Sequence, residues 1–307
     1  MERHQLEWRP ILVLLVLSIL WGASYAAVKI AAIGVAPLFM ACIRSAVAGL
    51  CLFLWMRIKG IPPFPERGLF GHGLVVGLLF GAEFGCIYLG LNYTLASRTY
   101  IFVYTAPFLV AVGAHFLLPG DRLSAVKAIG LSLAFVGVVI LFARDWGKTT
   151  LTTLTGDLLV LVAGAFWAST TLYIKRFLTK RALPIQTLFY QLAFSAPLLL
   201  FFSIILEDRL WYGFSLAVGI SLVYQCIIVA FLSYLAWFHL IHRYPVSLLH
   251  AFTFFTPVFG VFVSGGLILG ERMGLALFVS LGLVCLGMLF VNWPSSRERL
   301  QGNRNRS

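Results

Sequence analysis

Two charged residues lie deep inside apolar stretches of this sequence, and they are its first candidates for chemistry. Arg44 and Glu83 each lie seven positions from the end of a stretch long enough to cross a bilayer. A charge within hydrocarbon is costly and usually serves a function. The carboxylate of Glu83 is suited to bind an ammonium group or to carry a proton. Lys29, near the end of another stretch, is a further candidate.

A second candidate group is aromatic. Tyr100 and Tyr104 are spaced i, i+4 just before Pro107, and His250 has the same relation to Pro257 that Tyr100 has to Pro107. Each proline frees a backbone carbonyl four residues earlier, which a membrane tolerates only against protein or a wet cavity. These side chains are therefore predicted either to line a binding wall or to pack between helices.

Two tryptophans near the middle of apolar stretches extend this group. Trp21 and Trp167 occupy corresponding positions in the two halves of the chain and could flank a central cavity, with core packing as the alternative. Gln191 and Tyr234 are weaker candidates for the opposite wall.

The elements that must position these side chains are membrane-spanning helices. Of 307 residues 61% are hydrophobic and 11% are charged, and the mean hydropathy is +0.95, whereas a soluble domain carries roughly 25% charged residues. At about 20 residues per span, ten segments qualify. They are 11–31, 37–56, 68–90, 99–118, 124–143, 158–174, 185–206, 214–238, 246–269 and 274–292.

The sequence also repeats itself with an offset of about 146 to 150 residues. "WGASYAAVKIA" at 21–31 corresponds to "WASTTLYIKRF" at 167–177, and the segment at 105–123 corresponds to the one at 255–273. Five spans per repeat is an odd number, so the second repeat must begin on the opposite side of the membrane. The sequence thus predicts an all-α integral membrane protein with two inverted five-helix repeats around a central cavity, an arrangement typical of carriers. Its expected parts are 1–150, 151–293 and a basic tail, 294–307.

The repeat leaves two interpretations of the buried charges open. Arg44 corresponds to Gln191 and Glu83 to Ser233, so both charges are absent from the second repeat. One interpretation is a structural ion pair, kept because losing one partner would strand the other. In the other, Glu83 faces the cavity and binds a substrate ammonium or a coupling proton. Lys29 is similarly open between snorkelling to the interface and contacting a substrate carboxylate.

Positive charge predicts the orientation. With a cytoplasmic N-terminus, most Lys and Arg fall on the cytoplasmic side, as membrane proteins prefer. Only Arg98, Arg144, Lys148, Arg209 and Arg272 remain in outer connections. Both termini are therefore predicted to be cytoplasmic. The net charge of +12 is spread over short connections, which argues against nucleic acid as a partner.

The residues also resemble a known family. Trp21, Gly22, Lys29, Pro37 and Arg44 are similar to the start of the EamA-type drug/metabolite transporters. The segments "LNYTLASRTYIFVYTAPF" at 91–108 and "LGERM" at 269–273 resemble its later signatures. The resemblance implies an exporter of amino acids, including aromatic ones, or of other metabolites or drugs. The wider superfamily also exchanges sugar nucleotides and phosphates.

The expected function is secondary transport out across a bacterial inner membrane. The chain has no P-loop signature, and it lacks the HExxH and GxSxG motifs of hydrolases, so neither ATP hydrolysis nor an enzyme is expected. A phosphorylated-substrate exchanger and a channel are alternatives. The five cysteines have no paired spacing, and no cofactor or metal is expected. Small residues in the fifth and tenth segments suggest packing helices or a homodimer face.

Overall fold

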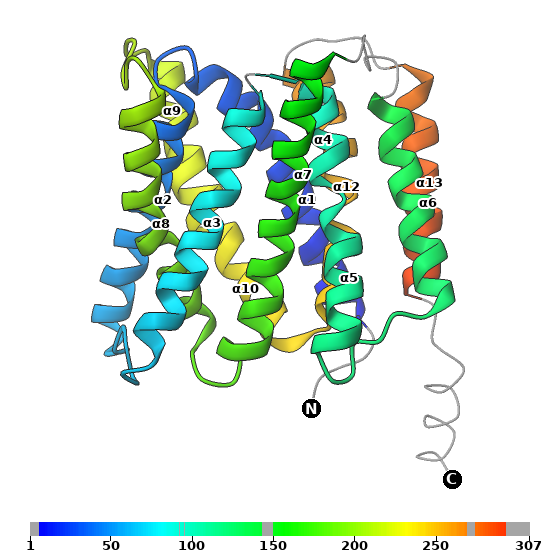
Figure 1. Cartoon of the computed structure of the whole chain (residues 1–307), viewed down its shortest axis with the longest axis horizontal. Coiled ribbons are helices and arrows are strands. Elements are labelled where there is room, and N and C mark those ends of the chain that lie inside the picture. The colour runs from blue at the N-terminus through cyan, green and yellow to red at the C-terminus, as the bar shows by residue number, and fades with distance from the viewer. Residues whose placement is uncertain (1–5, 92, 95, 143–149, 269–273, 293–307) are drawn as a thin grey trace.

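The named elements of the described chain are all helical (Figure 1). The computed structural model describes residues 6–91, 93–94, 96–142, 150–268 and 274–292. The first repeat holds α1 (Trp8–Ala31), α2 (Pro37–Ile58), α3 (Leu69–Leu91), α4 (Ala96–Val103), α5 (Ala106–Leu117) and α6 (Ala125–Phe142). The second holds α7 (Leu151–Tyr173), η2 (Ile174–Leu178), α8 (Pro184–Leu206), α9 (Leu216–Val223), η3 (Tyr224–Ser233), α10 (Tyr234–Arg243), α11 (Val246–Phe252), α12 (Phe255–Phe259), η4 (Gly260–Ile268) and α13 (Leu275–Val291). The predicted tail at 294–307 and the "LGERM" segment lie outside the described residues.

These helices account for the predicted spans. Eight described helical segments are long and apolar enough to cross a membrane, and two shorter apolar ones cover Ile101–Leu117 and Leu275–Val291. Each of the ten predicted segments coincides with one helix or with a run of consecutive helices. A helix satisfies its own backbone hydrogen bonds, which hydrocarbon cannot do.

Two spans are interrupted where the sequence places proline. α4 gives way to α5 just before Pro107, and α11 gives way to α12 just before Pro257, because proline lacks the N–H that would continue the helix. Thr105 and Thr253 donate their hydroxyls to carbonyls three residues back, at 2.7 and 2.6 Å. The predicted proline breaks are therefore present, and nearby hydroxyls satisfy part of the interrupted backbone.

The sixth and eighth predicted spans have wrong boundaries. The eighth, predicted at 214–238, continues as a helix to Arg243. The sixth span was expected at 158–174, but α7 begins at Leu151 because Thr150 caps it. The Thr150 hydroxyl accepts a hydrogen bond from the Thr153 N–H, and the Thr153 hydroxyl accepts one from the Thr150 N–H, which forms a capping box. Asp157 consequently lies inside a helix rather than in an outer connection.

The second repeat also contains helix irregularities that hydropathy does not reveal. Its described part includes the π-helical segments η2, η3 and η4, whereas the described part of the first repeat includes none. π-helical turns are rare and concentrate at functional sites. η3 ends at Ser233, so it delivers that hydroxyl and the following Tyr234 to the interior.

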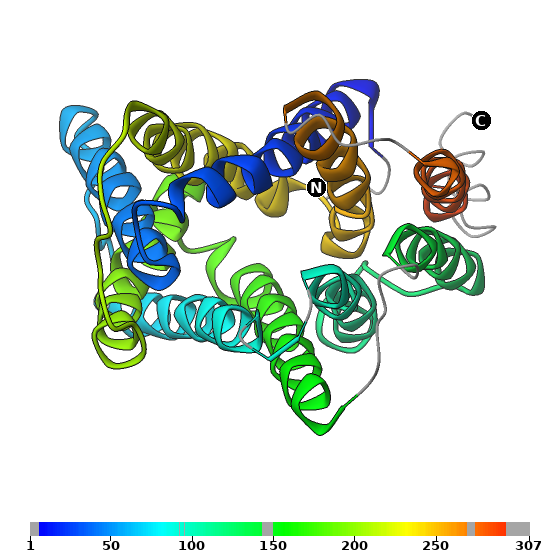
Figure 2. The same ribbon diagram turned by 90° about the horizontal axis from the view of Figure 1, so that it is seen from above.

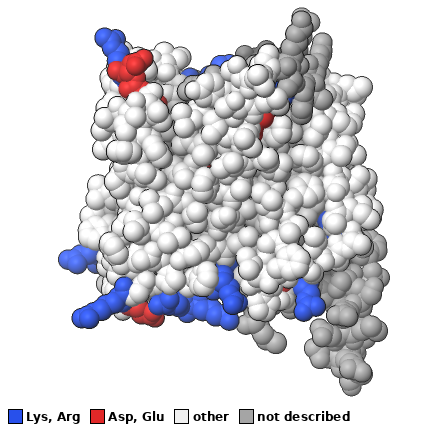
Figure 3. All heavy atoms as spheres, viewed as in Figure 1, with Lys and Arg blue, Asp and Glu red and all other residues white. Residues whose placement is uncertain are grey.

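The view from above shows how the repeats interlock (Figure 2). α1 runs between helices of the second repeat, and α6 and α13 stand side by side at one edge (Figures 1 and 2). The start of α1 and the end of α13 lie toward the same face, along which Lys and Arg gather (Figure 3).

α6 and α13 meet through their small residues, as packing helices were predicted to do. A Cβ added to Gly130 would lie 2.5 Å from the Gly287 carbonyl oxygen, and one added to Gly287 would lie 2.5 Å from the Gly130 carbonyl oxygen. A Cβ on Gly137 would lie 2.9 Å from the carbonyl oxygen of Ser280. These small residues therefore pack α6 against α13 within one chain. A homodimer through the outer faces of the two helices stays a prediction.

Replacing Gly130 by leucine should destabilise the fold by about 1–3 kcal/mol, because the new side chain meets backbone that cannot move aside. Gly282→Leu is the matched control, since a Cβ at Gly282 meets nothing within 4 Å. The measurement is the temperature at which half of the detergent-solubilised protein remains monodisperse. Equal midpoints for the two variants would contradict the close contact.

Candidate functional site

Arg44 and Glu83 form a charge centre between α2 and α3. Both side chains are buried, and the guanidinium acts electrostatically on the carboxyl group. The two side chains nevertheless make no salt bridge, so the structure does not favour the structural ion pair among the two interpretations left open by the sequence. Glu83 Oε2 and the Nε and Nη2 atoms of Arg44 are buried without a hydrogen-bond partner among the described residues.

Among the described residues, the Arg44 guanidinium is contacted by aromatic rings and not by a carboxylate. Its guanidinium carbon lies 4.5 Å from the centroid of the Phe84 ring and 5.8 Å from that of Tyr234. Cation–π contacts of this kind stabilise a desolvated cation by roughly 2 kcal/mol without using its N–H donors. Nε and Nη2 of Arg44 and Oε2 of Glu83 therefore have no partner among the described residues.

A continuous row of rings leads away from the charge centre. This aromatic row consists of Tyr234, Trp21, Trp237, His250, Trp167 and Tyr104. Successive ring centroids are 6.0, 5.3, 5.4, 5.1 and 6.0 Å apart, mostly in edge-to-face geometry. Both repeats contribute, since the rings come from α1, α7, α10, α11 and the turn between α4 and α5.

Hydrogen bonds fix α1 against the second repeat at the start of this row. The Trp21 indole Nε1 donates to the Ser233 hydroxyl at 2.8 Å. Further along, the Tyr224 hydroxyl donates to the Leu20 carbonyl at 2.9 Å. The Gln225 amide donates to the Ser24 hydroxyl at 2.8 Å. These contacts all join α1 to η3, so the π-helical segment sets the position of the Trp21 ring.

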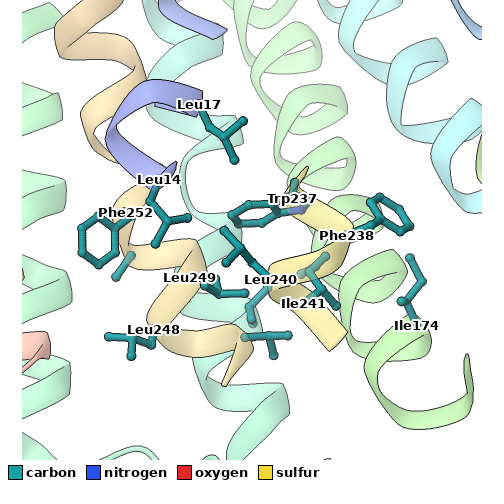
Figure 4. Packing of buried hydrophobic residues seen from close by; sticks show 14 of the residues in the cluster. Leu14, Leu17, Ile174, Trp237, Phe238, Leu240, Ile241, Leu248, Leu249 and Phe252 are labelled. Carbon is teal, nitrogen blue, oxygen red and sulfur yellow. The ribbon is translucent and has the colours of Figure 1, made fainter. Parts of the chain in front are cut away.

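Apolar side chains enclose the middle of the row. Leu14 and Leu17 of α1 and Leu249 of α11 lie around the Trp237 ring (Figure 4). Trp237 is itself buried. Such surroundings exclude water, which strengthens any electrostatic contact a ligand makes with the nearby charges.

The structure brings seven of the ten predicted site residues together. They are Arg44, Glu83, Trp21, Tyr104, Trp167, Tyr234 and His250. The side chain of Tyr100 lies outside the described residues. Lys29 is exposed in the last turn of α1, apart from the group. Gln191 is buried on α8, with no hydrogen bond or ring contact to the row.

Two residues at the site were missed from the sequence. Neither Trp237 nor Thr171 is among the ten residues predicted from the sequence. The Thr171 hydroxyl lies 3.0 Å from Nε2 of His250. A signal was present in the sequence, because Thr171 lies four residues after Trp167 and hence on the same helical face.

A buried ion pair was also missed. Arg98 was expected in an outer connection, yet it is buried on α4 and forms a salt bridge with Asp157 on α7. Arg98 Nε lies 3.0 and 3.1 Å from the two carboxylate oxygens, and the Thr94 hydroxyl donates to Oδ1 at 2.6 Å. The late start predicted for α7 concealed this partner.

Lys175 has a structural role on the other side of the protein. Its Nζ donates to the carbonyl oxygens of Ile241 and Tyr244 at 2.9 and 3.0 Å. It thereby satisfies carbonyls at the C-terminal end of α10, where cations are favourable. Lys29 occupies the corresponding position in the first repeat but is exposed, so the two lysines are not equivalent in their surroundings.

Within the described residues there is no group of three or more His, Cys, Asp or Glu side chains that could hold a metal ion. The described site consists of two buried charges of opposite sign, Arg44 and Glu83, beside the aromatic row.

Comparisons with known proteins agree with this architecture. The chain is 24% identical to an uncharacterized transporter, YoaV, of Bacillus subtilis (strain 168), over 92% of this chain and 96% of that protein. It is 26% identical to a probable amino-acid metabolite efflux pump of Escherichia coli (strain K12), over 92% of this chain and 93% of the relative. A solved crystal structure has a TM-score of 0.78 at 19% identity and covers 92% of this chain and 98% of its own, which shows the fold alone.

The sequence profile of the EamA-like transporter family matches the chain twice, over residues 8–143 and 154–293. The two matches cover most of the chain and correspond to its two repeats. This chain is a membrane transporter that belongs to the EamA-like transporter family.

Proposed function

We propose that this transporter is a secondary carrier that exports amino acids, or similar small metabolites, across the cytoplasmic membrane. One observation carries the proposal: Arg44 and Glu83 are both buried, within electrostatic range of each other, with unpartnered donors and an unpartnered acceptor. An amino acid presents a carboxylate and an ammonium group on one carbon, so it complements both at once. Its side chain would extend along the aromatic row.

The relatives support the substrate class in part. One relative is called a probable amino-acid metabolite efflux pump, while others are uncharacterized transporters. Inverted repeats support alternating access, because the two halves can exchange conformations around a central site. With no P-loop in the sequence, the driving force is a solute or ion gradient.

The remaining cations argue against a phosphorylated substrate. Phosphate recognition favours several converging cations or forked arginines. Among the buried cations of the described chain, Arg98 is bound to Asp157 and Lys175 to backbone carbonyls. Arg44 alone offers too little charge for a sugar nucleotide. Export of a drug remains the second candidate, since the aromatic row suits apolar cations.

The orientation and assembly belong to the same proposal. We place both termini in the cytoplasm, since Lys and Arg gather on the face where α1 begins and α13 ends (Figure 3). The membrane is proposed to be a bacterial inner membrane. A homodimer would use the outward faces of α6 and α13, where Ile129, Leu275, Phe278 and Leu289 are exposed.

Reconstitution of the purified protein in liposomes tests the proposed function. We expect saturable uptake of labelled amino acids without ATP, and acceleration when the vesicles are preloaded with unlabelled substrate. Each substrate is measured with and without a pH gradient, and inorganic phosphate is added as a competitor. Absence of uptake for every amino acid would refute the proposal. Inhibition by phosphate would favour the exchanger, and non-saturable flux would indicate a channel.

A further inference from the structure

His250 is the one histidine of the aromatic row, and its side chain is fully buried. Its ring carries two nitrogen atoms that can form hydrogen bonds. It lies on α11, one turn before that helix gives way to α12. The ring centroids of Trp167 and Trp237 lie 5.1 and 5.4 Å from its own. It therefore occupies the middle of the row, three rings from Arg44.

The hydrogen bonds of His250 are incomplete. Nε2 is 3.0 Å from the Thr171 hydroxyl, while Nδ1 is buried with no partner among the described residues. Leaving a buried polar atom unpaired costs its full desolvation energy, and the large majority of buried side-chain polar atoms are paired. An apolar side chain would have filled this position among the rings without that cost.

We propose that Nδ1 of His250 hydrogen-bonds the side chain of the transported substrate and so determines specificity. The carrier then favours amino acids whose side chain ends in a hydroxyl or carboxamide over apolar side chains of the same shape. This inference rests on the proposed function, the export of amino acids or similar small metabolites. Removing one partner of a buried hydrogen bond discriminates more strongly than adding or removing a methylene.

Thr171 positions this interaction. A neutral imidazole has one donor and one acceptor, so the role of Nδ1 is opposite to that of Nε2. The Thr171 hydroxyl can either donate to Nε2 or accept from it, which leaves Nδ1 free to match the partner. Hydroxyl and carboxamide groups each present a donor and an acceptor, and both fit such a nitrogen.

Competition between isosteric amino acids tests the inference in proteoliposomes of the full-length protein. The pairs are leucine and asparagine, methionine and glutamine, and phenylalanine and tyrosine, each measured as an inhibitor of one labelled substrate. In the wild type, the polar member of at least one pair should inhibit at a concentration about 10- to 100-fold lower, which corresponds to one buried hydrogen bond.

Four substitutions identify the atom responsible. His250→Phe and His250→Gln should bring the ratio close to one, because phenylalanine has no nitrogen and glutamine retains only a group near Nε2. His250→Asn places a polar atom near Nδ1 and should keep most of the preference. Thr171→Val removes only the positioning hydroxyl and should give an intermediate ratio. Each variant is first checked for monodispersity in detergent.

The outcomes separate the two proposals. If amino acids inhibit but no pair shows a preference, or if the preference survives in His250→Phe, the role of His250 is refuted while the amino-acid carrier stands. If none of the six amino acids inhibits, the proposed function fails and the inference fails with it. A preference lost in His250→Asn but kept in His250→Gln would assign the contact to Nε2 and overturn the role of Nδ1.

Discussion

Replacing Glu83 by glutamine should reduce amino-acid transport by about 100-fold or more and abolish uptake driven by a pH gradient. The carboxylate is the acceptor proposed for the substrate ammonium, and glutamine removes its charge while keeping its shape. A hydrogen bond to a charged group contributes up to about 3 kcal/mol, which corresponds to a factor of about 100. The measurement is the initial rate of labelled uptake with and without an imposed pH gradient.

Glu66→Gln is the matched control for this prediction. Glu66 binds Arg181 in a half-exposed salt bridge at 2.7 Å, and such pairs contribute little. The control should transport like the wild type. Arg44→Gln should weaken substrate binding as strongly as Glu83→Gln does, whereas it should leave the response to pH intact in whatever flux remains. Unchanged gradient-driven flux in Glu83→Gln would refute proton coupling through this residue.

Removing Asp157 should destabilise the protein by about 3–5 kcal/mol, because it leaves the Arg98 guanidinium buried without its anion. Asp157→Ala is compared with the double substitution Arg98→Leu and Asp157→Leu. Leucine is a reasonable replacement for Arg98, since Leu248 stands at the corresponding position of the second repeat. The double variant should recover most of the lost stability, as replacement of a whole buried pair by apolar residues is often neutral.

Stability is measured by chemical denaturation in micelles, followed by tryptophan fluorescence. Arg181→Ala serves as the control, and we expect a change below about 1 kcal/mol, because its partner is half exposed. A double variant as unstable as Asp157→Ala would show that the stabilisation comes from the Thr94 contact or from packing, and not from a charge left unpaired.

Much of the fold was predictable from the sequence because a bilayer restricts the choices. Ten apolar stretches gave ten helical runs, and Pro107 and Pro257 gave breaks at the expected places. The start of α7 was not predictable from hydropathy, because its first two turns are rich in threonine and are held by the Thr150 cap. The π-helical segments were also missed, since they leave no signature in apolar composition.

The sequence identified most residues of the site, but it did not reveal the contacts between them. Mid-span position and proximity to proline identified Trp21, Trp167, Tyr104 and His250, which the structure joins into one row. The sequence could not decide whether Arg44 pairs with Glu83, because the orientation of a guanidinium depends on rings contributed by other helices. No property of the local sequence carries that information.

The small-residue contacts between α6 and α13 have a mechanical consequence. An offset of 150 residues maps Gly130 onto Ser280 and Gly137 onto Gly287. It thus maps the contact between Gly130 and Gly287 onto the contact between Ser280 and Gly137. The rotation that exchanges these two contacts leaves the point midway between them unmoved. In a carrier whose two repeats exchange conformations, that point would keep its position. The close contacts of Gly130, Gly137 and Gly287 hold α6 and α13 together on either side of it.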